Sequence, residues 1–408
     1  MLLDDCRFDW LQKSHNLELL ISKSRNNTIE TTIPQFLSFV LLIYLLPLAV
    51  LLTALCKSRV HSRPLKRDFS VSILVSVRDE EEAIVTCLTA LEAQEFDGQR
   101  IEMIVADDNS SDGTFERINA FADKSSADIK IIQNPNPDKY KSSKKAALET
   151  AAQQATGDIL LFTDADCRPG KNWARSMASM FDDSIGLVAG FSPQTAPGGL
   201  WGDVLQIDAA AAAFVAAGTI ESGRGVTCTG RNLAVRKQAL LDVGGYASLP
   251  DSLSGDDDFL LHKISRHRQW KVRYAFSPGA VVPAAGPKNV RCFLQQKRRH
   301  LSAGKAYRPF AQFVYALFHL ANLAVWLGPL AAFYFRAPLL FVPLGAKLVA
   351  DYCCLHFFLR KFQQQIRPKA FLLWQPLFLF YNIFTGPTSF GGKLEWGADA
   401  CVQKADVS

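Results

Sequence analysis

A pair of aspartates at the end of an apolar run is the feature of this sequence with the clearest chemistry. Asp164 and Asp166 follow the segment ILLFT, and only Ala165 separates them. In an extended chain, side chains two residues apart point to the same side, so both carboxylates can share one hard divalent cation, Mg²⁺ or Mn²⁺. Such a cation would neutralise a diphosphate and act as a Lewis acid for its departure.

Other acidic residues also follow apolar runs. Asp79 and Glu80 come just after VSILVSV, and Asp107 and Asp108 end the run IEMIVADD. The alternative interpretation is that each aspartate only caps the helix that follows it. Capping would explain one or two of these sites, but it does not explain three sites on one edge of a sheet.

Short β-branched runs alternate with helical patterns between residues 69 and 290. The repeated order of strand, helix and strand predicts an α/β fold with a parallel sheet and right-handed crossovers. Ligands of such sheets bind at the carboxyl ends of the strands, where the acidic residues lie. The predicted strands are 71–77, 101–108, 129–134 and 158–166, and the predicted helices are 80–94, 113–123 and 143–156.

Apolar segments flank this region on both sides. About 20 apolar residues span a bilayer as a helix, and we expect about four transmembrane or interfacial helices, at 34–56, 309–335, 337–359 and 370–392. Lys347 and Asp351 lie one turn apart in the third segment and can neutralise each other in a bundle. The fourth segment contains prolines, and it either spans, re-enters or lies in the interface.

The charge pattern predicts the orientation. Residues 57–68 carry five Lys or Arg against one Asp, and the positive-inside rule places such a flank in the cytosol. We therefore expect a multi-pass protein of the cytoplasmic membrane whose α/β domain is cytosolic. The expected parts are a polar segment 1–33, the first helix 34–56, the domain 57–290, a basic helix 291–308, a membrane region 309–392 and a tail 393–408.

The composition excludes some classes of protein. With 49% hydrophobic and 11% aromatic residues, the chain can build a large core and is not a disordered or fibrous protein. The net charge of +6 would suit nucleic acid or an anionic membrane. Much of it comes from residues 57–68 and 291–308, which adjoin apolar segments, so the expected partner is the lipid bilayer and not nucleic acid.

Five motifs in order resemble a family 2 glycosyltransferase of the GT-A fold. They are VSVRDEEEAI, VADDNSSDGT, SKKAALETAAQQATGDILLFTDADC, GDDDFLL and QQKRRH, spread over roughly residues 70–305. The membrane helices on either side also resemble the integral-membrane members of that family. The resemblance implies a Rossmann-like, mostly parallel sheet and a nucleotide-sugar donor.

The resemblance also implies roles for single residues on the donor side. Lys144 would approach the diphosphate or the base, and Asp164 and Asp166 would bind the metal through which the diphosphate is held. The residues expected near the nucleoside are Asp79, Glu80 and Asp108, the last as acceptor of a hydrogen bond from uracil or ribose.

Three consecutive aspartates, 256–258, lie where the family has its catalytic base, and Asp257 matches best. An acceptor hydroxyl must lose its proton as it attacks the anomeric carbon, and a positioned carboxylate can take it. The alternative is that these aspartates only cap a helix and complement its dipole. The sequence alone does not rank Asp256 against Asp257.

The basic stretch 291–308 has two compatible interpretations. It predicts an amphipathic helix at an anionic membrane surface, and Gln296 and Arg299 are the counterpart of the family's QxxRW motif, over the pyrophosphate. His300 stands at the position of the tryptophan and offers less surface for stacking on an acceptor sugar. The resemblance places Gly230 and Asn232 in the acceptor-side loop.

These observations predict a membrane-anchored, inverting glycosyltransferase. It would move a sugar from a nucleotide-diphosphate donor, a UDP-sugar as first expectation, to a lipid-linked or glycan acceptor. A processive polysaccharide synthase is the first alternative, but it would need a secretion channel and the altered QxxRW counts against it. A catalytically inactive membrane scaffold is the second, and the retained aspartates argue against it.

Overall fold

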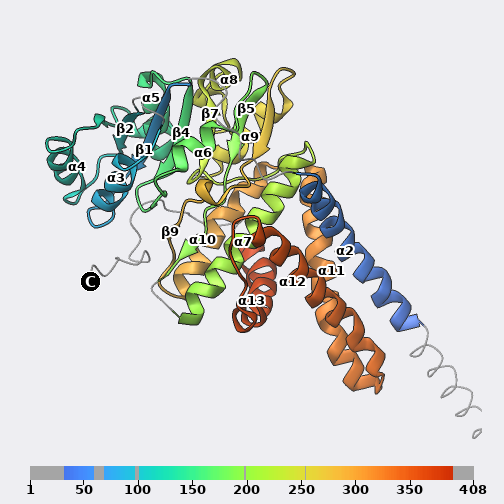
Figure 1. Ribbon diagram of the computed structural model, residues 1–408. Coiled ribbons are helices and arrows are strands. Elements are labelled where there is room, and N and C mark those ends of the chain that lie inside the picture. The colour runs from blue at the N-terminus through green and yellow to red at the C-terminus, as the bar shows by residue number, and fades with distance from the viewer. Residues whose placement is uncertain (1–31, 59–68, 97–100, 197–198, 253, 389–408) are drawn as a thin grey trace, which may run out of the picture. The chain divides into compact units, whose positions relative to one another are not determined.

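The computed structural model describes residues 32–58, 69–96, 101–196, 199–252 and 254–388 (Figure 1). The chain divides into two compact units. The first comprises residues 1–49 and 313–353, and the second comprises residues 50–312 and 354–408. The second unit contains the predicted α/β domain.

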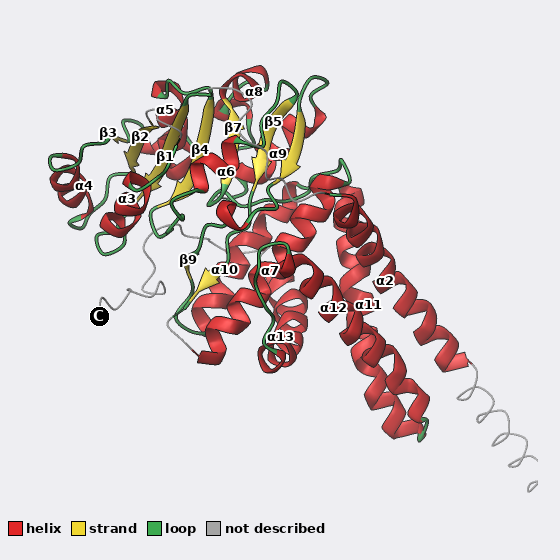
Figure 2. Ribbon diagram, in the orientation of Figure 1, coloured by secondary structure: helices red, strands yellow, loops and turns green. Residues whose placement is uncertain are grey.

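A seven-stranded sheet forms the centre of the second unit (Figure 2). Its order is β3-β2-β1-β4-β7-β5-β8, and all strands run parallel except β7, which is antiparallel to β4 and β5. This arrangement confirms the predicted mostly parallel sheet. The strands are β1 (Val71–Val77), β2 (Ile101–Asp107), β3 (Asp128–Gln133), β4 (Ile159–Asp164), β5 (Ile185–Ala189), β7 (Leu233–Arg236) and β8 (Lys271–Tyr274).

The strand order of the sheet reverses at β1. β2 and β3 lie on one side of β1, and β4 lies on the other. In open α/β sheets the ligand binds at the carboxyl ends of the strands where the order reverses in this way. The fold therefore directs attention to the ends of β1 and β4.

Helices cover the sheet. The main hydrophobic core lies between the sheet and α3 (Ile84–Glu92), α4 (Thr114–Ala122) and α6 (Trp173–Ala178). Helix α5 (Ser143–Gln154) packs on β1, β2 and β3, and α8 (Lys237–Asp242) and α9 (Asp256–Arg266) pack on β5. The first four strands and the helices between them lie within a few residues of their predicted bounds.

Local sequence explains why β1 and β4 come together. All seven residues of β1 are buried. Gly157 precedes β4, and a Cβ atom at this position would lie 2.5 Å from the backbone nitrogen of Ser72 in β1. Only glycine permits this approach. Ser142 then begins α5 as its N-cap, because its hydroxyl accepts a hydrogen bond from the Lys145 nitrogen at 3.3 Å.

The second unit also contains a group of helices outside the sheet (Figures 1 and 2). They are α7 (Gly199–Glu221), α10 (Val290–Ser302), α13 (Pro368–Phe380) and α14 (Gly386–Thr388), with a 3₁₀ turn Ala303–Ala306 after α10 and a π-helical turn Tyr381–Thr385 after α13. Strands β6 (Gln194–Thr195) and β9 (Ala284–Ala285) pair beside them as a small parallel sheet. Three further 3₁₀ turns are Pro137–Lys139, Tyr246–Ser248 and Pro278–Ala280.

Within the described residues, four helices are long and apolar enough to cross a membrane. Three match the predicted segments: α2 (Ile33–Lys57), α11 (Pro309–Phe335) and Pro338–Arg360, which combines a 3₁₀ turn with α12 (Val342–Arg360). The fourth is α7, which we did not predict as a span, and 56% of its most apolar window is buried. The segment predicted at 370–392 forms α13, the π-helical turn and α14, and its last four residues lie outside the described part, so its membrane role stays a prediction.

The first unit contains the predicted ion pair. Lys347 Nζ lies 2.9 Å from Asp351 Oδ2, and the Tyr44 hydroxyl donates a hydrogen bond of 2.7 Å to Asp351 Oδ1. The Tyr44 ring stacks on Phe318 with a centroid separation of 4.5 Å. The charges of α12 therefore satisfy each other among apolar helices, as such groups must in a low-dielectric interior.

Candidate active site

The paired aspartates lie at the carboxyl end of β4. The strand ends at Asp164 and the chain turns at Ala165 and Asp166, so the pair does not lie on one extended segment as predicted. Ala165 is buried in the main core, whereas both aspartates are half-buried. Burial and then the charge of Asp164 raise the pKa of Asp166, so the two carboxylates interact electrostatically.

Three cations surround Asp164. Lys144, in the first turn of α5, forms an ion pair with it. Burial alone would raise the pKa of Asp164, but Lys144, followed by Arg231 and Arg299, lowers it. The sheet edge therefore presents positive side chains from three separate segments beside one carboxylate.

Glu80 adds a further carboxylate to this edge. Burial, followed by the negative charges of Asp166 and Asp164, raises its pKa to about 8. The Glu80 backbone nitrogen donates to Thr114 Oγ1 at 2.8 Å, which ties the end of β1 to the start of α4. Oxygen ligands suit a hard divalent cation, so Asp164 and Asp166 fit the predicted metal. Cys167 does not take part, because burial raises the pKa of its thiol well above the ordinary value.

The other predicted nucleoside residues are held by hydrogen bonds. Asp79 has a positive φ of 53°, and its carboxylate accepts a hydrogen bond of 2.6 Å from the Ser111 nitrogen. Asp108 is fully buried, and Asn134 Nδ2 donates to it at 2.7 Å while Arg78 lies 3.4 Å away. The Asp108 carboxylate is therefore buried and paired with Arg78. Contact of Asp108 with uracil or ribose stays a prediction.

Asp257 lies in the first turn of α9, and its charge acts on Lys144. Its carboxylate accepts hydrogen bonds from the backbone nitrogens of Gly230, at 2.7 Å, and Asp258, at 3.1 Å. Burial raises its pKa although Lys144 opposes the rise. Gly255, just before α9, has a φ of +95°, and this left-handed conformation favours glycine.

Asp256 and Asp258 differ from Asp257 in their surroundings. Burial and the charge of Asp257 raise the pKa of Asp256 to about 7, and its Oδ1 is buried without a hydrogen-bond partner among the described residues. Asp258 is buried and accepts hydrogen bonds from the Cys228 nitrogen, at 2.9 Å, and from the Tyr307 hydroxyl. Asp258 therefore holds α9 in place. Of the three aspartates, Asp257 has the strongest electrostatic effect on Lys144.

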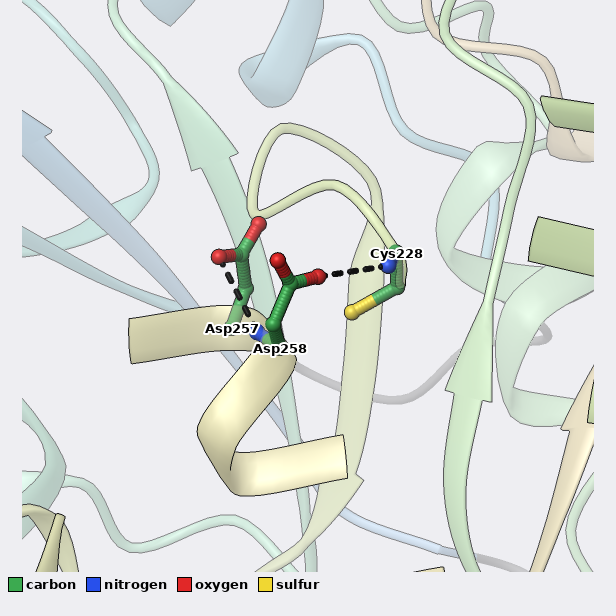
Figure 3. Close-up of side chains that lie close together, drawn as sticks. All are labelled: Cys228, Asp257 and Asp258. Atoms are coloured by element: carbon green, nitrogen blue, oxygen red, sulfur yellow. Dashed lines mark hydrogen bonds between the residues drawn. The ribbon is translucent and has the colours of Figure 1, made fainter. Parts of the chain in front are cut away.

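A second group of possible metal ligands lies at this helix. Cys228 Sγ and one oxygen each of Asp257 and Asp258 lie within 4.8 Å of one another (Figure 3). Burial raises the pKa of the Cys228 thiol well above its ordinary value. A protonated thiol binds no hard cation, so this group does not fit the predicted metal, and the carboxylate pair at β4 does.

The basic helix α10 brings its QxxR residues to the site. Gln296 Oε1 accepts a hydrogen bond of 2.9 Å from Gln194 Nε2 in β6. The charge of Arg299 acts on both Asp164 and Lys144. His300 reaches solvent, yet desolvation by the surrounding protein, together with the charge of Arg299, lowers the pKa of its imidazole well below the ordinary value. The ring is therefore neutral near pH 7.

The two residues predicted for the acceptor side have different surroundings. Gly230 lies against Asp257 through its backbone nitrogen. Asn232 is fully buried, accepts a hydrogen bond from Trp173 Nε1 at 3.0 Å and donates to the carbonyls of Phe191 and Ala280 at 2.8 and 2.7 Å. Its side chain thus joins three segments of the core, and it can shape the acceptor loop only through the backbone that it holds.

Sequence reasoning missed three residues of this site. Arg231 contributes charge at Asp164, Tyr307 holds Asp258, and Arg78 lies near Asp108. Arg231 stands between the two predicted acceptor residues, and its charge was the available signal. Tyr307 is distant in sequence from Asp258, and no spacing rule connects them.

The mostly parallel α/β sheet and its flanking helices have the GT-A fold. The family described as "Glycosyl transferase family 2" matches residues 72–239, and "Glycosyl transferase family group 2" matches residues 164–383, more than half of the chain. The chain belongs to the family 2 glycosyltransferases.

Individual relatives agree with this assignment. Glycosyltransferase AglE of Haloferax volcanii is 32% identical over 130 residues, which cover 32% of this chain and 41% of that protein. Probable glycosyltransferase YdaM of Bacillus subtilis is 28% identical over 238 residues, 56% of this chain and 54% of that protein. The chain thus spans about half the length of these relatives or less.

A solved structure shares the fold. It is the mannosyltransferase PcManGT from Pyrobaculum calidifontis in complex with GDP-Man and Mn²⁺, with a TM-score of 0.55 and 19% identity, covering 88% of this chain and 98% of that one. At this identity the likeness concerns the fold alone.

Proposed function

We propose that this protein is a membrane-anchored, inverting glycosyltransferase that moves a sugar from a nucleotide-diphosphate donor to a lipid-linked or glycan acceptor. The observation that carries the proposal is the position of Lys144. It forms an ion pair with Asp164 at the end of β4, and the charge of Asp257 at the start of α9 also acts on it. One lysine therefore lies between a candidate diphosphate site and a candidate base.

Asp257 is the proposed catalytic base. The acceptor hydroxyl must lose its proton as its oxygen attacks the anomeric carbon. Two backbone N–H groups orient the Asp257 carboxylate, and burial raises its pKa, which makes it a better proton acceptor. The bond from the anomeric carbon to the donor phosphate breaks as the new bond forms, and the diphosphate leaves with the electron pair. A single displacement of this kind inverts the configuration at that carbon.

Positive charge assists the departure of the diphosphate. Lys144, Arg231 and Arg299 all act on Asp164, so they lie where the departing charge would develop. A divalent cation, Mg²⁺ or Mn²⁺, held by Asp164 and Asp166 would supply charge neutralisation and Lewis acidity there. Gln296 positions this edge through its hydrogen bond to Gln194.

A UDP-sugar is the proposed donor. Asp79, Glu80 and Asp108, at the ends of β1 and β2, form the nucleoside side. The mannosyltransferase that shares the fold was solved with GDP-Man, so a GDP-sugar is the competitor that the donor experiment must include.

The membrane supplies the proposed setting for the acceptor. Among the described residues, four helices have the length and composition to span a bilayer, and the basic flank at 57–68 favours a cytosolic catalytic domain in a multi-pass protein of the cytoplasmic membrane. Because His300 replaces an aromatic platform, we propose transfer of one or a few sugars and not processive synthesis.

The test is a donor screen on the full chain in lipid nanodiscs with Mn²⁺ or Mg²⁺. UDP-glucose, UDP-galactose, UDP-N-acetylglucosamine and GDP-mannose are offered one at a time, and release of the nucleoside diphosphate is measured with size-resolved analysis of labelled product. We expect metal-dependent release from a UDP-sugar and a short product. Release from GDP-mannose alone would overturn the donor assignment, and a high-molecular-weight polymer would overturn the short-product proposal. Absence of release from every donor would contradict the proposed function.

A further inference from the structure

A buried carboxylate that is not among the candidate site residues connects helical elements of the second unit. Asp208 lies in α7 and is 1% exposed. Its Oδ1 accepts hydrogen bonds from Trp374 Nε1 in α13, at 3.1 Å, and from the Tyr381 hydroxyl in the π-helical turn, at 2.9 Å. Its Oδ2 forms an ion pair with Lys297 in α10. From α7, Asp208 thus contacts α10, α13 and the π-helical turn.

The side chain of Lys297 is also largely buried. Its side chain is 13% exposed, and Nζ lies 5.0 Å from the ring centroid of Phe293 and 5.4 Å from that of Tyr381. Phe293 and Tyr381 belong to one hydrophobic cluster together with Leu205 of α7. The face of α10 that carries Phe293 and Lys297 therefore packs against Leu205 and Asp208 of α7 and against the π-helical turn.

The opposite face of α10 carries the site. Successive residues of a helix are about 100° apart, so Arg299 lies about 200° around the axis from Lys297. The Arg299 carbonyl accepts a hydrogen bond of 3.3 Å from Ser254 Oγ, two residues before α9 and its Asp257, and Gln296 accepts one from Gln194 of β6. The charge of Arg299 also acts on Asp164. A rotation of α10 about its axis would therefore move Arg299 away from Asp164.

Removing an ion pair from water is costly, and packing alone would not require one at this position. We propose that Asp208 is a positioning residue of the transfer reaction: through Lys297 it fixes the rotation of α10 and so holds Arg299 beside the donor site. The inference rests on the proposed function, because there Arg299 faces the departing diphosphate.

The test uses Asp208→Asn in the full chain. The amide oxygen can still accept from Trp374 and Tyr381, but the ion pair with Lys297 is lost. We expect kcat/KM for the donor to fall about tenfold or more. In a chain that already carries Arg299→Ala, adding Asp208→Asn should change kcat/KM less than about twofold, because the two changes act through the same contact. Fully additive losses would overturn the inference.

Asp203→Asn is the matched control. Asp203 also lies on α7 and pairs with Arg367, the residue before α13, at 3.1 Å, but this ion pair does not include α10. The Asp203–Arg367 ion pair joins α7 to the start of α13, and the hydrogen bond from Trp374 to Asp208 joins the same two segments. Loss of the Asp203–Arg367 ion pair should therefore leave kcat/KM within about twofold of the wild-type value. Lys297→Arg, which keeps the ion pair, should retain most activity, whereas Lys297→Met should resemble Asp208→Asn.

A readout that does not depend on sugar transfer separates this inference from the proposed function. Amide hydrogen exchange in Val290–Ser302 should accelerate in Asp208→Asn and stay unchanged in Asp203→Asn. If the wild-type chain transfers no sugar, the proposed function fails and exchange alone decides whether Asp208 anchors α10; unchanged exchange would overturn the anchoring.

The pair Asp208→Leu with Lys297→Met covers the case in which the single variant does not fold. It replaces both charges by apolar groups, which is often tolerated in a core. We expect this double variant to fold and to remain about tenfold slower than wild type. Wild-type kcat/KM in the folded double variant would show that the ion pair does not position Arg299 for the reaction, and it would overturn the inference.

Discussion

Lys144 forms an ion pair with one of the carboxylates of the candidate donor site. It neutralises Asp164, while Asp166 and Glu80 keep raised pKa values because burial and neighbouring carboxylates disfavour their charged forms. An incoming diphosphate adds more negative charge to the same edge. A divalent cation would offset the negative charge of the carboxylates and of the diphosphate, so nucleotide binding and metal binding should depend on each other.

Replacement of one member of the pair tests this dependence. Asp164→Ala should weaken UDP binding in Mn²⁺ buffer by about tenfold or more, because a carboxylate ligand of the cation is lost. Calorimetry with and without a chelator measures the effect. Asp158→Asn is the control, since Asp158 lies just before the other end of β4 and is exposed. Unchanged UDP affinity in Asp164→Ala would argue against the pair as the metal site.

The choice between Asp256 and Asp257 shows where residue-level prediction ended. The sequence showed three adjacent aspartates, and only the family resemblance favoured Asp257, without ranking it firmly against Asp256. The structure distinguishes them, because Asp257 accepts two backbone hydrogen bonds and acts on Lys144, whereas Asp258 is held by Tyr307. Tyr307 is separated from Asp258 by 49 positions, and only the folded chain brings them together.

Elements were predicted more reliably than contacts. The strand 71–77 and the start of α5 at residue 143 lie where a β-branched run and a helical pattern predicted them. The end of β4 was wrong by two residues, because the turn at Ala165 depends on packing of that side chain into the core. The role of helix α7 was the hardest to predict, because its apolar run fits both a membrane span and a buried helix. The partners of its buried Asp208 come from distant segments of the chain, which no local pattern indicates.

One carboxylate connects the amino ends of the central strands. Glu102 of β2 accepts hydrogen bonds from Ser72 of β1 and from the Thr156 nitrogen, at 2.9 Å, and pairs with Lys130 of β3. Burial alone would raise its pKa, but Lys130, Ser72 and Thr156 outweigh burial and lower the pKa to about 2. A pKa below the unfolded value means that the charged form stabilises the fold.

This contact predicts a pH-dependent stability. Glu102→Gln should lower the free energy of unfolding by about 1–3 kcal/mol at pH 7. The difference from wild type should persist above pH 4.5, the ordinary value for Glu, and disappear as the pH falls toward 2. Denaturant unfolding at several pH values measures it, with Glu116→Gln on the exposed face of α4 as control. A difference that does not change between pH 7 and pH 2 would contradict the role of the Glu102 charge.

At the scale of the whole molecule, the distribution of charge and apolar helices predicts a topology. The segments 57–68 and 361–367 are both basic and follow apolar helices. Epitope tags placed before residue 1 and within 361–367 can be tested on intact and permeabilised cells. We expect the first tag to be reached from outside and the second only after permeabilisation. The reverse pattern would contradict a cytosolic catalytic domain.

The most direct test of the central claim, that Asp257 takes the acceptor proton during sugar transfer, is the turnover of Asp257→Asn in the full chain with the donor found by the screen. We predict that kcat falls by about 10²–10⁴-fold, the usual scale for a lost general base, while donor affinity stays within about threefold. Asp251→Asn, an exposed change six residues earlier, should keep kcat. Near-normal turnover in Asp257→Asn, or a loss of donor affinity that accounts for the whole effect, would contradict the account.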